Sequence, residues 1–241
     1  MPVAAGAALG PGMGSLSVDR ILSIALSVAV VLVATVLHEV AHAAAAYALG
    51  DPTAKEQGRL TLNPVAHLHP VGSVLLPALM AMAGGPIFAF AKPVPYNPNR
   101  LRHPVRDEVL VALAGPACNL AQALVGTLLF RGLYAAVSQM PANDAMAGAG
   151  ITALQVLYTY VYLNLMLMFF NLIPLPPLDG SSIVSPLLKG EARRWYYTVQ
   201  HYALPVLMVL LYVVPMVLHM DPVGWYLDAT AGNLLDVLLG F

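Results

Sequence analysis

The stretch ILSIALSVAVVLVATVLHEVAHAAAAYALG, residues 21–50, is an apolar run interrupted by two histidines and one glutamate. It is long enough to cross a bilayer as a helix, which takes about 20 apolar residues. The Gly-Asp-Pro sequence at its end is typical of helix termination, so we expect one long helix over residues 20–49. Ionisable side chains are costly to bury in such a helix. His38, Glu39 and His42 therefore indicate a functional site within the membrane.

The whole chain has the composition of a membrane protein. Of its 241 residues, 59% are hydrophobic and 10% are charged, whereas soluble domains carry about 25% charged residues. The mean hydropathy is +0.74. A net charge of −1 gives no reason to expect a nucleic-acid partner. The single cysteine, Cys118, excludes an internal disulfide and a cysteine zinc finger, and we expect it to pack as a small apolar side chain.

Further apolar segments predict an all-α polytopic membrane protein with about 4–6 transmembrane helices. Helices are expected at 109–137, 151–173 and 202–219. Residues 73–91 are apolar enough to enter a bilayer but are broken by prolines and glycines, and the sequences around them are typical of strands and turns. We therefore predict a re-entrant β/loop region at residues 59–107, whose strand-like pieces would pair with an unwound substrate.

The His-Glu-x-x-His spacing is typical of a zinc site. Residues four apart lie on one face of a helix, so His38 and His42 can bind one ion with Glu39 alongside. Zinc held by imidazoles keeps a position for water and lowers the pKa of that water to about 7, so that the glutamate can act as general base. A third protein ligand is expected. Asp179 is the strongest candidate because it follows an apolar span and a rigid Pro-rich turn; the alternative is an Asx-turn or a helix N-cap.

Other polar side chains compete with these or assist them. Glu56, His67 and His69 are weaker candidates for the third ligand, and loop hydrogen bonding is the more ordinary role for the two histidines. Asn119 and Asn171 lie in apolar helices, where an amide can donate to a developing oxyanion or hold a substrate backbone. The alternative is a hydrogen bond that joins two helices.

Five motifs, in this order, resemble the site-2 protease family of intramembrane zinc metalloproteases: HEVAH, GRLTLNPVAHLHPVG, KPVPYNP, LAGPACNL and NLIPLPPLDG. The resemblance covers residues from about 20 to 190 and is to the compact prokaryotic branch without PDZ or CBS domains. The residues that it implies are the zinc ligands His38, His42 and Asp179, the catalytic acid/base Glu39, and the active-site asparagines Asn119 and Asn171. One Zn²⁺ per chain is implied. Ser181 stands where many relatives have a second glycine, and His69 stands where an aspartate is common.

The resemblance also divides the chain. Residues 1–19 are rich in glycine, alanine and proline and are predicted to be disordered. Residues 20–190 are expected to form the catalytic intramembrane core. Residues 191–241 are expected to form C-terminal helices that act as a gate or lie in the interface. Within them, 223–241 is apolar but carries two aspartates, so it is either an interfacial helix or a poor final span.

Topology supplies an independent argument. His38 and Asp179 can share an ion only if the helices 20–49 and 151–173 end on the same side of the membrane, which a re-entrant path for 73–91 allows. This path places nine of the eleven cations on one side. The nine are Lys55, Arg59, Lys92, Arg100, Arg102, Arg106, Lys189, Arg193 and Arg194. By the positive-inside rule that side is cytoplasmic.

The resemblance implies an intramembrane zinc endopeptidase of the cell membrane, and the distribution of cations places its active site toward the cytoplasm. Its partners would be the lipid bilayer and single-span membrane proteins or signal-peptide remnants as substrates. Two alternatives are a membrane metal or proton transporter, which would need polar residues repeated across several spans, and an inactive scaffold. The intact Glu39 and the full set of candidate ligands argue against the scaffold.

Overall fold

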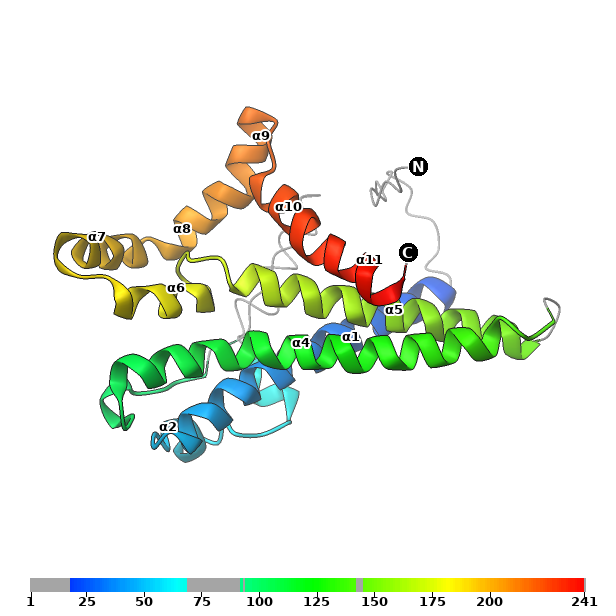
Figure 1. Cartoon of the computed structure of the whole chain (residues 1–241), viewed down its shortest axis with the longest axis horizontal. Coiled ribbons are helices and arrows are strands. Elements are labelled where there is room, and N and C mark those ends of the chain that lie inside the picture. The colour runs from blue at the N-terminus through cyan, green and yellow to red at the C-terminus, as the bar shows by residue number, and fades with distance from the viewer. Residues whose placement is uncertain (1–17, 69–91, 93, 142–144, 241) are drawn as a thin grey trace.

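Three long helices form the centre of the structure, a computed structural model that describes residues 18–68, 92, 94–141 and 145–240. They are α1 (Val18–Ala48), α4 (Pro104–Val137) and α5 (Ala145–Asn171). All three are long and apolar enough to cross a membrane. Helices α1 and α5 run in the same direction and α4 runs antiparallel to both (Figure 1). The described residues contain no strand, which confirms the all-α polytopic class.

The predicted helix boundaries were wrong by several residues. Helix α1 begins at Val18, inside the segment expected to be disordered, while residues 1–17 lie outside the described part of the chain. Helix α4 begins at Pro104 rather than at 109 because proline suits the first position of a helix and because the Asp107 carboxylate accepts a hydrogen bond from the His103 N–H at 2.8 Å. The predicted re-entrant region therefore ends in the first turn of a long helix.

The expected strand after residue 59 was also wrong for the part that the structure describes. Helix α2 (Thr53–Glu56) is followed by bends and by the 3₁₀ turn η1 (Pro64–His67). The Asn63 side chain accepts the Val65 N–H at 3.1 Å and a proline opens the turn, so local capping overrides the alternating pattern. The predicted apolar segment 73–91 lies outside the described residues.

The connection between α1 and α4 begins and ends at the same end of the bundle. The Arg102 N–H donates to the Leu49 carbonyl at 3.1 Å, and the Asn97 N–H donates to Asp51 Oδ2 at 2.5 Å. A short 3₁₀ turn, η3 (Pro98–Arg100), lies between these contacts. The described ends of this connection, residues 49–51 and 97–102, therefore lie together where α1 ends and α4 begins.

The second half of the chain consists of shorter helices. In order they are α6 (Asp179–Val184), η4 (Ser185–Leu187), α7 (Gly190–His201), α8 (Ala203–Met208), the π-helix η5 (Val209–Val213) and α9 (Val214–Leu218). Residues 191–241 were expected to form helices, but the bounds of the polar helix α7 were not predicted. The helix expected at 202–219 is formed by α8, η5 and α9 together. Helix α7 meets this run at a bend of 79°. Counting the bent pair as one span gives four candidate spans in the described residues, the lower end of the predicted range.

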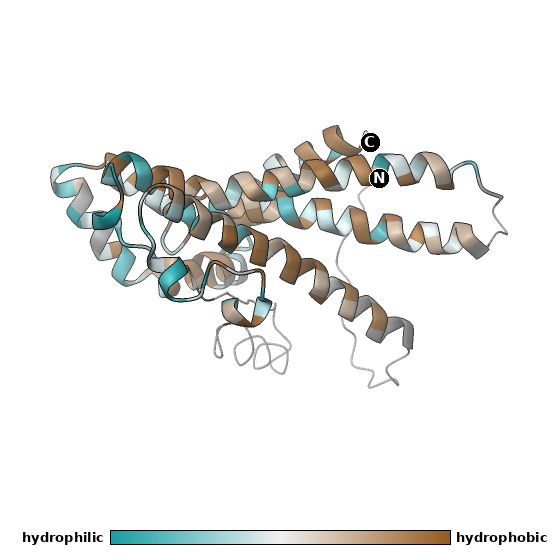
Figure 2. Ribbon diagram, turned by 90° about the horizontal axis from the view of Figure 1, so that it is seen from below, coloured by the Kyte–Doolittle hydropathy of each residue, from teal (hydrophilic) through white to brown (hydrophobic). Residues whose placement is uncertain are grey.

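The C-terminal run packs on the bundle. It comprises α10 (Pro222–Leu227), the π-helix η6 (Asp228–Gly232) and α11 (Asn233–Leu239). Ala231, Leu235 and Leu239 join a buried apolar cluster with side chains of α4 and α5, such as Phe130 and Leu165. Figure 2 shows that α1 is hydrophobic over most of its length, whereas hydrophilic residues gather at the end of the bundle where α1 ends and α4 begins.

Candidate metal centre

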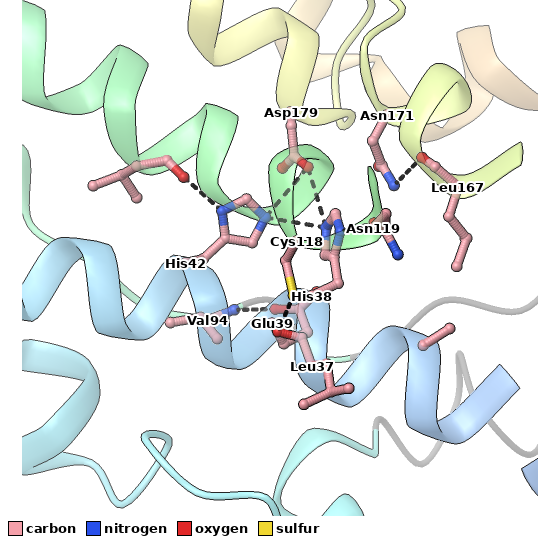
Figure 3. Close-up of polar contacts among 12 residues, drawn as sticks. Leu37, His38, Glu39, His42, Val94, Cys118, Asn119, Leu167, Asn171 and Asp179 are labelled. Carbon is pink, nitrogen blue, oxygen red and sulfur yellow. Dashed lines mark hydrogen bonds and ion pairs between the residues drawn. The ribbon is translucent and has the colours of Figure 1, made fainter. Parts of the chain in front are cut away.

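Three side chains converge where α1, α4 and α6 meet. His38 and His42 lie one turn apart on α1, and their Nε2 atoms are 3.0 Å from each other. Asp179 opens α6, and its Oδ2 lies 3.2 Å from His38 Nε2 and 3.3 Å from His42 Nε2 (Figure 3). In the part of the chain that the structure describes, these three form the one group of three or more residues with the spacing of metal ligands.

The hydrogen bonds of the two rings fix which nitrogen faces the centre. His38 Nδ1 lies 2.5 Å from Asn119 Oδ1, and His42 Nδ1 lies 2.7 Å from the Val111 carbonyl oxygen. Both oxygens are acceptors, so each Nδ1 carries the proton and donates it. In the neutral imidazole this leaves the Nε2 lone pair free, which is the arrangement that metal-binding histidines adopt.

Three acceptor atoms thus face one another without a proton between them, and Asp179 Oδ2 is buried without a hydrogen-bond partner among the described residues. Such an arrangement is unfavourable unless a cation joins it. Ligands on zinc bonds of about 2.0–2.1 Å in a tetrahedral site lie about 3.3 Å apart, which matches the observed spacing. Two imidazoles and one carboxylate are also a ligand set that catalytic zinc uses. The residues therefore fit zinc.

The carboxylate ligand is ionised at neutral pH. Burial raises the pKa of Asp179, but the effect of the adjacent His38 and His42 side chains outweighs burial and brings the pKa to about 2. An ionised carboxylate is the form that binds a metal. The aspartate is therefore in the protonation state that a metal ligand needs.

Two glycines, which the sequence analysis did not single out, shape the centre. Gly115 of α4 faces the rings, and a Cβ there would clash with His42 Nε2 and lie 2.5 Å from His38 Cε1. Gly180 follows the aspartate, and a Cβ there would lie 2.5 Å from the Ile173 carbonyl oxygen at the end of α5. The first glycine lets α4 pack closely against the two rings, and the second lets α6 begin against the end of α5. Both belong to motifs quoted above, which was the available signal.

Glu39 lies beside this centre. Its Oε2 accepts a hydrogen bond from the Val94 N–H at 3.0 Å. Glu39, His42 and Asp179 line one cavity of about 160 Å³, together with Tyr96 among others. Burial raises the pKa of Tyr96 to about 12, assisted by the nearby Glu108, so its phenol stays protonated at neutral pH. The predicted acid/base residue and two predicted ligands therefore open into a common space.

The two predicted active-site asparagines are placed differently. Asn119 is fully buried: its Oδ1 accepts from His38, and its Nδ2 donates to Asn164 Oδ1 at 2.8 Å. Asn171, at the end of α5, donates to the Leu167 carbonyl at 3.0 Å within its own helix (Figure 3). Asn119 thus orients a ligand and, through Asn164, also joins two helices. A role for either amide toward an oxyanion stays a prediction.

The rival ligands lie elsewhere. Glu56 is exposed and pairs with Arg100 Nη1 at 2.9 Å. His67 is buried, and its Nε2 lies 2.9 Å from the Thr61 carbonyl oxygen, in keeping with a loop hydrogen-bonding role. His69 lies outside the described residues. Cys118 packs near α1, with its Sγ 3.5 Å from the Leu37 carbonyl oxygen.

Comparison with known proteins agrees with this geometry. The model of the family described as "Peptidase family M50" matches residues 136–214. The chain is 40% identical over 204 residues to "Putative zinc metalloprotease YwhC" of Bacillus subtilis, covering 82% of this chain and 87% of that protein. No solved structure matches.

Two mycobacterial proteins named "Putative zinc metalloprotease Rip2" are also similar. The identity is 32% over 180 residues for Mycolicibacterium smegmatis, covering 75% of this chain and 64% of the relative. It is 33% over 179 residues for Mycobacterium tuberculosis H37Rv, covering 74% and 63%. The chain thus spans less than two thirds of the length of these two relatives. From the similarity to YwhC over most of both chains, we conclude that this chain belongs to peptidase family M50, the site-2 protease family of membrane zinc metalloproteases.

Proposed function

We propose that the protein is an endopeptidase that hydrolyses peptide bonds in or near the transmembrane helices of single-span membrane proteins or signal-peptide remnants. The observation that carries this proposal is the convergence of His38, His42 and Asp179, within a bundle of apolar helices, beside the carboxylate of Glu39. A hydrolytic centre among apolar helices long enough to cross a membrane suits substrates that are themselves in the membrane.

His38, His42 and Asp179 would hold one zinc ion. When bound, zinc acts as a Lewis acid and lowers the pKa of a coordinated water to about 7. Asn119 and the Val111 carbonyl keep the two rings in the orientation and tautomer that ligation needs. These contacts hold both rings in place, which reduces the conformational freedom that ligation would cost.

Glu39 would move the proton. One carboxylate oxygen accepts the Val94 N–H, and we assign the other to take a proton from the attacking water and deliver it to the leaving amine. The cavity that Glu39 shares with His42 and Asp179 provides the space in which water and the scissile peptide would meet.

We further propose that the protein lies in the plasma membrane with this cavity toward the cytoplasm. The segments that carry most lysines and arginines flank the end of α1, close to the metal centre, and such segments favour the cytoplasmic side. Labelling of single cysteines introduced near Lys55 and near Arg131, with an impermeant reagent in intact cells, tests this orientation; only the second position is expected to react.

Zinc content and cleavage of a model transmembrane peptide by the purified protein test the proposed activity. Glu39→Gln is expected to abolish cleavage while one zinc per chain is retained, because the amide cannot accept the proton. Glu56→Gln, which removes an exposed carboxylate, is the matched control and should cleave normally. Turnover by a clean Glu39→Gln preparation would contradict the role of Glu39, and metal flux without proteolysis would favour a transporter.

A further inference from the structure

The sequence KPVPYN, residues 92–97, supplies the hydrogen bond that holds Glu39. Val94 has a proline on each side, and proline has no N–H, so the Val94 amide is the sole backbone donor between Lys92 and Tyr96. This donor is used on Glu39 Oε2. A residue that precedes proline is restricted to extended conformations, so the segment is stiff. The position of the carboxylate therefore depends on what anchors the segment.

Both ends of this segment are anchored by hydrogen bonds. At one end, the Asn97 N–H donates to the buried carboxylate of Asp51, just beyond the end of α1. At the other end, the Lys92 N–H donates to the His67 carbonyl at 2.9 Å, and the Lys92 carbonyl accepts from Arg59 Nη2 at 2.5 Å. The second anchor thus includes a charged side chain.

Arg59 is buried, with 5% of its surface exposed. Its Nη1 donates to the Ala66 carbonyl while its Nη2 donates to the Lys92 carbonyl, so one guanidinium joins the turn at residues 64–67 to the segment that holds Glu39. Burying a cation is expensive unless its donors are well used. The planar fork of arginine can hold two carbonyls at once, which the single ammonium of lysine does less well.

We propose that Arg59 is a positioning residue for Glu39, acting through Lys92 and the Val94 N–H. The inference rests on the proposed role of Glu39 in proton transfer. It extends that role to a buried side chain that joins the turn at residues 64–67 to the segment that holds Glu39. Proton transfer is sensitive to placement, since a displacement of about 1 Å can cost about 100-fold in rate.

The test compares Arg59→Met, Arg59→Lys and Arg100→Met in the full-length protein with zinc bound. Arg59→Met is expected to lower kcat for a model transmembrane peptide by about 10- to 100-fold with KM and zinc content unchanged. Arg59→Lys should recover part of the loss. Arg100→Met is the matched control, because Arg100 lies near the same segment but makes an exposed ion pair with Glu56; its kcat should equal that of the wild type.

Hydrogen exchange gives a readout that does not depend on activity. The amide of Val94 is protected by Glu39, so a peptide covering residues 92–97 should exchange faster in Arg59→Met, and also in Glu39→Ala, but not in Arg100→Met. Wild-type kcat and wild-type exchange in Arg59→Met would overturn the inference. If Arg59→Met does not fold, wild-type kcat together with wild-type exchange in Arg59→Lys would overturn the inference.

The two proposals fail in different ways. If Glu39→Gln still cleaves, the proposed function fails whatever Arg59 does. If Glu39→Gln is inactive and the Arg59 variants match the wild type, only the positioning role fails. A loss confined to KM or to zinc content in the Arg59 variants would also contradict positioning, since it would assign Arg59 to substrate or metal binding.

Discussion

Gly115 lies against the imidazoles of His38 and His42, where there is no room for a side chain. Gly115→Ala is expected to weaken zinc binding by about 10- to 100-fold and to reduce cleavage in proportion, because a methyl group there clashes with His42 Nε2. Alanine favours a helix more than glycine does, so α4 itself should not suffer. Zinc titration of the apoprotein measures the change. Gly132→Ala on the same helix is the control, since no atom lies within 4 Å of its added Cβ; equal zinc affinity in both variants would contradict the steric account.

A substitution at Asn119 distinguishes two roles for this residue, which are orientation of the His38 ring and stabilisation of an oxyanion. Because its Oδ1 holds the His38 ring, Asn119→Ala is expected to lower zinc affinity by about 10- to 100-fold. Gln122→Ala is the control: Gln122 is buried one turn away and accepts from the Tyr160 hydroxyl at 2.7 Å, so its loss should cost stability without affecting zinc. Unchanged zinc affinity with a lower kcat in Asn119→Ala would instead favour the oxyanion role.

For individual residues, spacing and residue type were enough to predict that His38, His42 and Asp179 would lie together, as they do in the structure. Helical geometry places the first two together, and an isolated acid after an apolar span suggests the third. The contacts made by Asn119 could not be read in the same way. Its partners are distant in the sequence, and an amide in an apolar helix is compatible both with an active-site role and with a hydrogen bond that joins two helices.

Among the secondary-structure elements, the start of α6 decides where the carboxylate ligand lies. Gly180→Ala is expected to move Asp179 away from the histidines, since the added Cβ meets backbone carbonyls at the end of α5, which cannot yield as a flexible side chain can. We expect loss of zinc together with a lower melting temperature, measured by metal analysis and thermal unfolding. Gly148→Ala on α5, where no atom lies within 4 Å of the added Cβ, is the control. Wild-type zinc content in Gly180→Ala would contradict this packing argument.

The long apolar helices were predictable because bilayer-spanning segments have a strong compositional signal. The strand expected after residue 59 failed because alternation over a few residues competes with local capping, and Asn63 and Pro64 favour a 3₁₀ turn. The bounds of helix α7 were not predicted, for a different reason. Its sequence GEARRWYYTVQH is polar and carries no spanning signal.

For the molecule as a whole, the metal centre joins elements that are far apart in the chain. Removing zinc with a chelator is expected to lower the melting temperature and to abolish cleavage, with zinc restoring both, because an ion that binds only the folded chain stabilises it. The effect is about 4 kcal/mol when free zinc is 1,000 times its Kd. Thermal unfolding with and without chelator measures it. Asp179→Ala should lack most of this zinc-dependent shift; a full shift in that variant would contradict ligation by Asp179.

The topology was predictable only in part. Charge distribution favoured a connection between α1 and α4 that returns to its starting side, and the contacts of Leu49 with Arg102 and of Asp51 with Asn97 agree. The buried polar network that ties α1, α4 and α5 together, in which the Tyr160 hydroxyl donates to Gln122, was not predicted. Such pairings depend on how the helices rotate against one another, which hydropathy does not specify.

The order of the ligands along the chain has a consequence for biosynthesis. The two imidazoles enter the membrane with the first helix, whereas the carboxylate is translated only after α5. A nascent chain that has not yet reached α6 therefore holds an incomplete ligand set, and the zinc site can form only when most of the chain has been made.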